Sequence, residues 1–174
     1  MPFNIEAPRI YSKETPREIL AEDFKKLKGE LPIHGGWGYT RDGAVILEKE
    51  DFCSFYDVER IFVEKRIYEE LIIFAPKEKK CSGINWQMLI QKFQCFEDKK
   101  YDLLSYEVTA FLDSDREKLK NDYETNFDSA SAEWFKAHEE DRNNKMLTYN
   151  TEYWFDITNV FGQSFIPAAV KKTF

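Results

Sequence analysis

Two runs of alternating apolar and polar residues, joined by a short charged segment, restrict the fold of this chain more than any other feature. The first run spans 86–91, the second spans 104–110, and Glu97-Asp98-Lys99-Lys100 lies between them. A period of two places alternate side chains on opposite faces of a strand. The pattern therefore predicts a long β-hairpin with one face more apolar than the other.

A helix-start signal precedes this hairpin in the chain. Thr15-Pro16-Arg17-Glu18 combines a capping box with proline at the first helical position. The apolar residues that follow recur on one helical face, and Gly29 is typical of a residue that ends a helix. We expect a helix over 16–28.

Two further helices and a strand are expected after the hairpin. Ser114-Asp115-Arg116-Glu117 is a second capping box and predicts a helix to about Asn126. A third helix is expected to follow, and the alternating residues of 147–157 predict another strand. For the third helix, we expect a cap at Asp128 or Ser129, with Trp134 and Ala137 facing inward.

The remaining segments give weaker signals. Short strands are expected at 3–7 and 44–47, and loops at 31–43 and 76–83. The segment 58–74 combines a helix-like apolar recurrence with residues that favour strands. We favour a helix that ends near Glu70 and a strand over 71–74; a pair of strands is the alternative.

Together these elements predict an α+β fold with a mostly antiparallel sheet and about three helices packed on one face. The length of 174 residues suits one domain, which we expect to span 1–174. The tail from about 161 contains glycine and proline and is expected to be irregular.

The sequence favours a cytoplasmic protein. The first residues do not show the basic start and apolar run of a secretory signal, and the apolar runs are far shorter than a membrane-spanning helix requires. The spacing of Cys53, Cys81 and Cys95 fits neither a disulfide framework nor a zinc ribbon. We expect no membrane association, no cofactor and no metal site.

A calcium-loop pattern at the second capping box supports the same expectation about metals. Acidic residues stand at 113, 115, 117 and 124, but Lys118 occupies the position at which such a loop requires glycine. Acidic side chains near the start of a helix are better explained by the helix dipole.

The negative charge of the chain is concentrated in one segment. Residues 97–144 contain 14 acidic and 7 basic residues, and the whole chain has a net charge of −7. Such a segment repels nucleic-acid phosphates and anionic lipids, whereas it attracts a basic protein. We expect no nucleic-acid partner, and we predict partner binding at Glu139, Glu140 and Asp141, unless the segment is simply a solvated surface.

The segment 34–43 is the most unusual local composition in the chain, because five of the seven glycines lie between 29 and 43. One hypothesis is a ligand site in which backbone amides cradle an anion, with an arginine as clamp and a histidine as acid–base group. Its residues are His34, Gly35, Gly36, Gly38 and Arg41. Another is that Trp37 and Tyr39 are interface anchors, and a third is a tight turn packed by Trp37.

These observations favour a non-catalytic binding protein over an enzyme. The leading hypothesis is an acidic inhibitor of a basic protein, acting in the way an immunity protein neutralises a toxin. The alternative is a small enzyme or small-molecule-binding domain built on 34–43. A third possibility is a subunit of a homo-oligomer.

Overall fold

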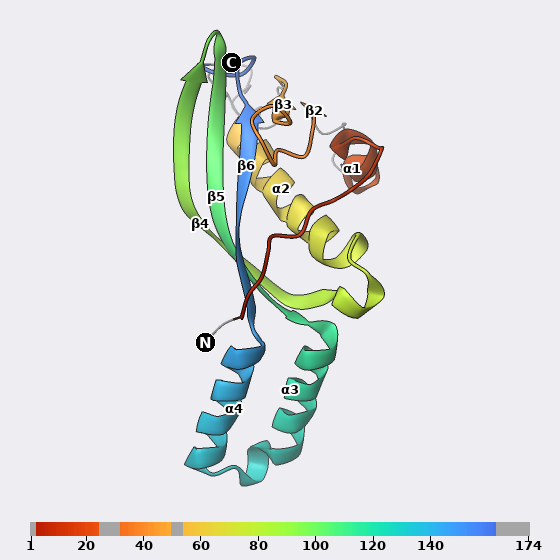
Figure 1. Ribbon diagram of the computed structural model, residues 1–174, viewed down its shortest axis with the longest axis vertical. Coiled ribbons are helices and arrows are strands. Elements are labelled where there is room, and N and C mark those ends of the chain that lie inside the picture. Colours follow the sequence, from red (N-terminus) through yellow and green to blue (C-terminus); the bar gives the residue numbers. More distant parts are fainter. Residues whose placement is uncertain (1–2, 25–31, 50–53, 163–174) are drawn as a thin grey trace, which may run out of the picture. The chain divides into compact units, whose positions relative to one another are not determined.

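The computed structural model describes residues 3–24, 32–49 and 54–162 (Figure 1). The chain forms an α+β fold with a mostly antiparallel sheet and three main helices, as the alternation and capping signals predict. The helices are α2 (Phe55–Tyr68), α3 (Asp113–Asn126) and α4 (Ala132–Lys145), with a shorter α1 (Pro16–Phe24). The predicted end of the first helix, Gly29 and the tail beyond 162 lie outside the described residues.

The sheet has the strand order β2-β3-β6-β5-β4, and β1 pairs with β6. β6 is parallel to β1 and β3, β2 is antiparallel to β3, and β6 runs opposite to β5 (Figure 1). The strands are β1 (Phe3–Asn4), β2 (Ile33–Gly35), β3 (Val45–Leu47), β4 (Cys81–Phe96), β5 (Lys99–Leu112) and β6 (Leu147–Asp156).

The predicted hairpin is confirmed as β4 and β5, and both strands are longer than expected. Glu97 in the connecting turn has a φ of +54°, a left-handed conformation that a tight hairpin turn requires. The expectation of a loop over 76–83 is wrong at its end, because β4 begins at Cys81. Likewise, 31–43 is not all loop, because Ile33–Gly35 pairs with Val45–Leu47.

The ambiguous segment 58–74 is helical. α2 continues into a π-helical turn at Glu69–Ile73, closed by a bond from Phe74 N to Glu69 O of 2.8 Å. The predicted strand at 71–74 is therefore wrong. The wider turn changes the phase of the side chains, so that Glu69, Glu70 and Leu71 are buried in succession. Of the strand-forming residues of this segment, Leu71 is buried, whereas Ile73 and Phe74 are exposed.

The two predicted caps after the hairpin are displaced. α3 begins two residues earlier than the capping box predicts, with Leu112 at the N-cap and no side-chain cap bond, so the capping box at Ser114 does not form. α4 is capped by Ser131, whose hydroxyl accepts from Trp134 N at 3.2 Å, and not by Asp128 or Ser129. Trp134 is partly buried, but Ala137 is exposed, which corrects its predicted inward position.

The chain divides into two compact units. Unit 1 contains Met1–Arg9, Tyr68–Leu89 and Tyr106–Thr151, and unit 2 contains Ile10–Ile67, Ile90–Ser105 and Glu152–Phe174. The strands β4, β5 and β6 contribute residues to both units. The expectation of one domain over 1–174 stays a prediction.

Unit 2 is organised around a buried arginine. Arg66 of α2 is fully buried and donates hydrogen bonds of 2.9 Å to the main-chain oxygens of Trp37 and Glu152. Its guanidinium lies 4.3 Å from the ring centre of Tyr39 and 3.5 Å from that of Tyr153. These contacts compensate for burial of the charge and connect the 37–39 segment to β6.

Candidate functional site

The helices α3 and α4 form an antiparallel helical hairpin in unit 1, closed by a single 3₁₀ turn at Phe127–Ser129 (Figure 1). Leu119 is the buried residue of α3, and none of the residues of α4 is buried. Most side chains of this hairpin are therefore presented to the surroundings and are not needed to fill a core.

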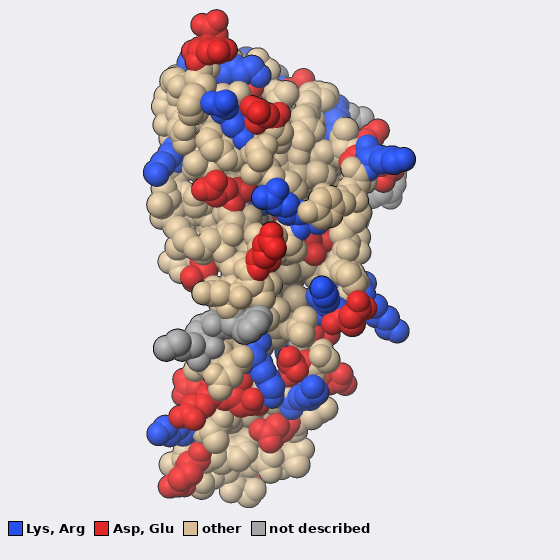
Figure 2. Space-filling model, viewed as in Figure 1, with Lys and Arg blue, Asp and Glu red and all other residues tan. Residues whose placement is uncertain are grey.

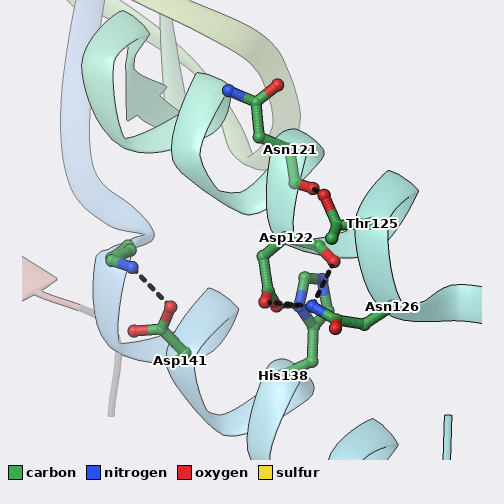
Figure 3. A network of polar contacts seen from close by, with 7 residues as sticks. Asn121, Asp122, Thr125, Asn126, His138 and Asp141 are labelled. Atoms are coloured by element: carbon green, nitrogen blue, oxygen red, sulfur yellow. Dashed lines mark hydrogen bonds and ion pairs between the residues drawn. The ribbon is translucent and has the colours of Figure 1, made fainter.

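A polar network joins the two helices (Figure 3). Asp122 of α3 lies 2.7 Å from His138 Nδ1 of α4 and also accepts a bond of 3.0 Å from Asn126 Nδ2. Because an ionised carboxylate only accepts hydrogen bonds, His138 donates from Nδ1. The imidazole also stacks on Trp134, with ring centres 4.9 Å apart. The network fixes the register of the two helices near their connected ends.

An exposed aromatic cluster lies beside this network. The ring centres of Tyr123 and Phe127 are 4.8 Å apart, and those of Phe127 and Phe135 are 6.0 Å apart. Tyr123, Phe127 and Phe135 are 41%, 47% and 43% exposed. Contiguous exposed aromatic side chains on a protein surface are typical of partner-binding sites.

The same end of the hairpin carries most of the net negative charge of the chain. We call residues 122–141 the acidic tip, because they contain 7 acidic residues and 1 basic residue, a charge of −6 against −7 for the whole chain. On the face seen in Figure 2, the end of the hairpin is formed by uncharged residues with red carboxylates beside them. The tip thus combines aromatic side chains with a surrounding negative charge.

The predicted partner-binding residues Glu139, Glu140 and Asp141 lie in the acidic tip and are exposed on α4. Glu140 lies 4.0 Å from Lys136 Nζ, and Asp141 pairs with Lys145. The pKa of Glu133 is lowered by a hydrogen bond with the Ser131 side chain, so this carboxylate keeps its charge to lower pH. Of the predicted acidic segment 97–144, residues 97–105 belong to unit 2 and not to the helical hairpin.

The predicted anchors Trp37 and Tyr39 take part in the packing of unit 2. Trp37 is 9% exposed and packs against Phe62, with ring centres 6.1 Å apart. The Tyr39 hydroxyl accepts a bond of 2.8 Å from Ile10 N, and its ring contacts Arg66. This burial corrects the expectation that Trp37 is an exposed interface anchor.

The glycines of 34–43 allow close approach of backbone segments. Gly36 N and Gly38 N donate to Ala44 O at 3.1 Å and Gly43 O at 2.8 Å, so these amides are not available to cradle an anion. Gly38 has a φ of +73°, and a Cβ there would lie 3.0 Å from Trp154 O. At Gly35, with a φ of +79°, a Cβ would lie 2.4 Å from Ala44 O.

The charged residues proposed for that ligand site are also engaged. His34 Nε2 lies 2.9 Å from Glu48 and 2.6 Å from Arg17 Nη1, and its side chain is exposed. Arg41 lies over the Phe96 ring at 4.4 Å. The ligand hypothesis for 34–43 therefore lacks the free amides on which it depended.

A buried carboxyl pair lies in unit 2. Glu59 of α2 is 2% exposed, and Asp102 of β5 is also buried and accepts a hydrogen bond from Gln91. Burial, with a smaller contribution from the charge of Asp102, raises the pKa of Glu59 to about 8. Burial also raises the pKa of Asp102, and the Gln91 bond opposes that shift. Because both carboxyls are buried, we expect their ionisation to affect the stability of the fold.

Sequence reasoning missed the tip aromatics and the Asp122–His138 pair. One local signal was present, since four aromatic residues and seven acidic residues fall within 122–141. Among the residues that the structure describes, no group of three or more histidine, cysteine, aspartate or glutamate side chains is arranged to hold a metal ion. No helix of the same residues is long and apolar enough to cross a membrane. Comparison with protein-family models, curated proteins and solved structures found no match for this chain.

Proposed function

We propose that this chain is a non-catalytic, cytoplasmic protein that binds and neutralises a basic partner protein, as an inhibitor or immunity-like protein does. The acidic tip is the binding surface. The observation that carries the proposal is the coincidence of three exposed aromatic side chains with a charge of −6 in 20 residues of one helical hairpin.

The two components of this surface have separate roles. Carboxylates such as Glu139 and Glu140 accelerate the encounter with a basic surface and exclude acidic partners. Exposed rings such as Phe127 and Phe135 supply apolar area with few rotatable bonds, which is typical of residues that dominate binding energy.

The proposal is tested with a tagged protein in a lysate of the native host, followed by reconstitution with the purified captured protein. We expect one protein of high isoelectric point that binds with 1:1 stoichiometry in calorimetry. The charge variant reverses three tip acids, and the aromatic variant truncates two rings. These variants are Glu139→Lys/Glu140→Lys/Asp141→Lys and Phe127→Ala/Phe135→Ala.

Each tip variant is expected to weaken binding at least about tenfold, since central interface residues often contribute more than 1.4 kcal/mol. A matched control reverses three exposed acids outside the hairpin and changes the net charge equally: Glu6→Lys/Glu14→Lys/Asp98→Lys. Equal losses in the control and the charge variant, an acidic partner, or no captured protein would refute the proposal.

A further inference from the structure

A cavity of about 840 Å³ lies in unit 1 along the helical hairpin, where its lining reaches from Asp113 to Tyr123 on α3 and includes His138 and Arg142 of α4. Its walls come from the start of β4, the end of β5, α3 and α4. Small-molecule sites typically enclose 300–1,000 Å³ and combine apolar walls with a few polar groups. Here Phe111 and Leu119 form apolar parts of the wall, and Ser82, Asn85 and His138 supply polar groups.

The charge of this cavity differs in sign from that of the acidic tip. Arg116, Lys120 and Arg142 line it together with two carboxylates, Asp113 and Glu117, which gives one net positive charge with His138 neutral. Lys120 pairs with Glu124 at 3.6 Å. Within the described part of the chain, neither Arg116 nor Arg142 forms an ion pair. Two arginines thus line the cavity without an ion pair to a described carboxylate, and they outweigh the negative charge of Asp113 and Glu117 only together with Lys120.

The local structure makes room for these arginines. Gly83 in β4 has a φ of +61°, and a Cβ at this position would lie 3.3 Å from both Arg116 Nε and Phe111 Cδ2. The Arg142 guanidinium lies 5.9 Å from the centre of the Phe111 ring. A glycine at position 83 therefore allows Arg116 to lie beside the ring that Arg142 approaches from α4.

We propose that this cavity binds a small organic oxyanion, a phosphate or carboxylate attached to an apolar or aromatic body. Arginine guanidinium groups donate paired hydrogen bonds to the planar or tetrahedral oxyanion. The apolar body lies against Phe111 and Leu119. This inference differs from the proposed partner binding, because Arg116 and Arg142, on which it depends, lie outside the acidic tip. Tyr123 and His138 belong to both surfaces.

The test measures binding of phenyl phosphate, inorganic phosphate and phenol to the full chain by NMR titration. We expect saturable binding of phenyl phosphate that is tighter than that of inorganic phosphate or phenol, with shifts at cavity residues. Benzoate separates a carboxylate preference from a phosphate preference. Tighter binding of benzoate than of phenyl phosphate identifies the natural group as a carboxylate, and the reverse order identifies a phosphate.

Removal of a positive charge and removal of a negative charge from the cavity are expected to change the affinity for phenyl phosphate in opposite directions. Arg116→Gln and Arg142→Gln are each expected to weaken phenyl phosphate binding about tenfold or more. Arg116→Lys is expected to weaken binding less than Arg116→Gln does, because lysine keeps the charge and loses only the paired donors. Glu117→Gln is expected to tighten binding. The matched control Lys118→Gln changes an exposed residue of the same helix that pairs with Asp115 outside the cavity, and we expect no effect.

Several outcomes would overturn the inference. Absence of saturable binding of all three anions would do so, as would equal losses in Arg116→Gln and Lys118→Gln. Weaker binding after Glu117→Gln would also contradict it, because that result indicates a cationic ligand. Thermal melting of each variant separates loss of binding from loss of fold.

Discussion

Buried ionisable residues show most clearly how single side chains in unit 2 are constrained. Arg66 is fully buried, and its charge is compensated by main-chain oxygens and two aromatic rings. Glu59 is buried as well, but Oε1 of its carboxyl has no hydrogen-bond partner among the described residues. The two residues occupy the same helix, yet the surroundings stabilise the charge of one and oppose the charge of the other.

This difference predicts a pH-dependent stability that depends on Glu59. Its pKa is about 8 in the folded chain against 4.5 as the ordinary value, so the unfolded chain releases the proton first as pH rises. The contribution of the neutral Glu59 carboxyl to the unfolding free energy is therefore complete below pH 4.5 and is lost as pH rises toward 8. For one proton the slope approaches about 1.4 kcal/mol per pH unit.

The measurement is urea unfolding at several pH values between 4.5 and 8. Glu59→Gln is expected to flatten the decrease of the unfolding free energy, while Glu64→Gln on the same helix retains it. Parallel pH profiles for wild type and Glu59→Gln would show that the Glu59 carboxyl is not held neutral by its surroundings.

At the scale of elements, helix starts depend on which candidate cap the backbone brings into position. Thr15 forms the predicted capping box, in which Thr15 N donates to Glu18 at 2.7 Å. The same motif at Ser114 fails, because β5 passes directly into α3 and leaves Leu112 at the N-cap. At α4, the 3₁₀ turn occupies Phe127–Ser129, so the first available cap is Ser131.

Replacement of the α4 cap residue Ser131 is therefore expected to destabilise the chain more than replacement of Ser129 does. Ser131→Ala is expected to lower the unfolding free energy by about 1 kcal/mol. Ser129→Ala removes a long contact to Asn126 O of 3.4 Å and is expected to change the unfolding free energy by less than about 0.5 kcal/mol. Thermal unfolding of both variants measures the difference.

The pKa of Glu133 gives a second test of the Ser131 cap. Its pKa is lowered by the Ser131 side chain, so NMR titration of Ser131→Ala is expected to show a higher Glu133 pKa than in wild type. An unchanged Glu133 titration, or a larger effect of Ser129→Ala on stability, would place the cap elsewhere.

At the scale of the whole molecule, charge is distributed unevenly along the chain. The acidic tip accounts for −6, whereas the other parts of α3 and α4, residues 113–121 and 142–145, contain 3 acidic and 5 basic residues. The single helical hairpin therefore carries opposite charges toward its two ends. This arrangement is the basis of the two proposals, a basic protein partner at the tip and a small oxyanion in the cavity.

The proposed role of the tip predicts salt-dependent association kinetics. The association rate constant for the captured partner is expected to fall about tenfold or more between 50 and 500 mM salt, because the Debye length shortens to a few ångströms. The dissociation rate constant is expected to change less. Stopped-flow measurements on wild type and Glu139→Lys/Glu140→Lys/Asp141→Lys make the comparison, and a salt-independent wild-type rate would contradict electrostatic steering.

The sequence by itself determined the features that depend on near neighbours in the chain. The hairpin of β4 and β5, the strand β6, the capped start of α1 and the α+β class all follow from period-two alternation or from a cap three residues away. The exposed position of Glu139, Glu140 and Asp141 also follows from their charge.

Tertiary structure decided the features that join distant residues. The pairing of Ile33–Gly35 with β3, the burial of Trp37 and the contact of Tyr39 with Arg66 join segments that no local pattern relates. Asp122 contacts His138, and Arg116 and Arg142 line one cavity. Both arrangements depend on the antiparallel packing of α3 and α4. Such contacts form because packing and hydrogen bonding outweigh local preference. The same reason applies to the predicted strand 71–74, of which residues 71–73 lie in a π-helical turn.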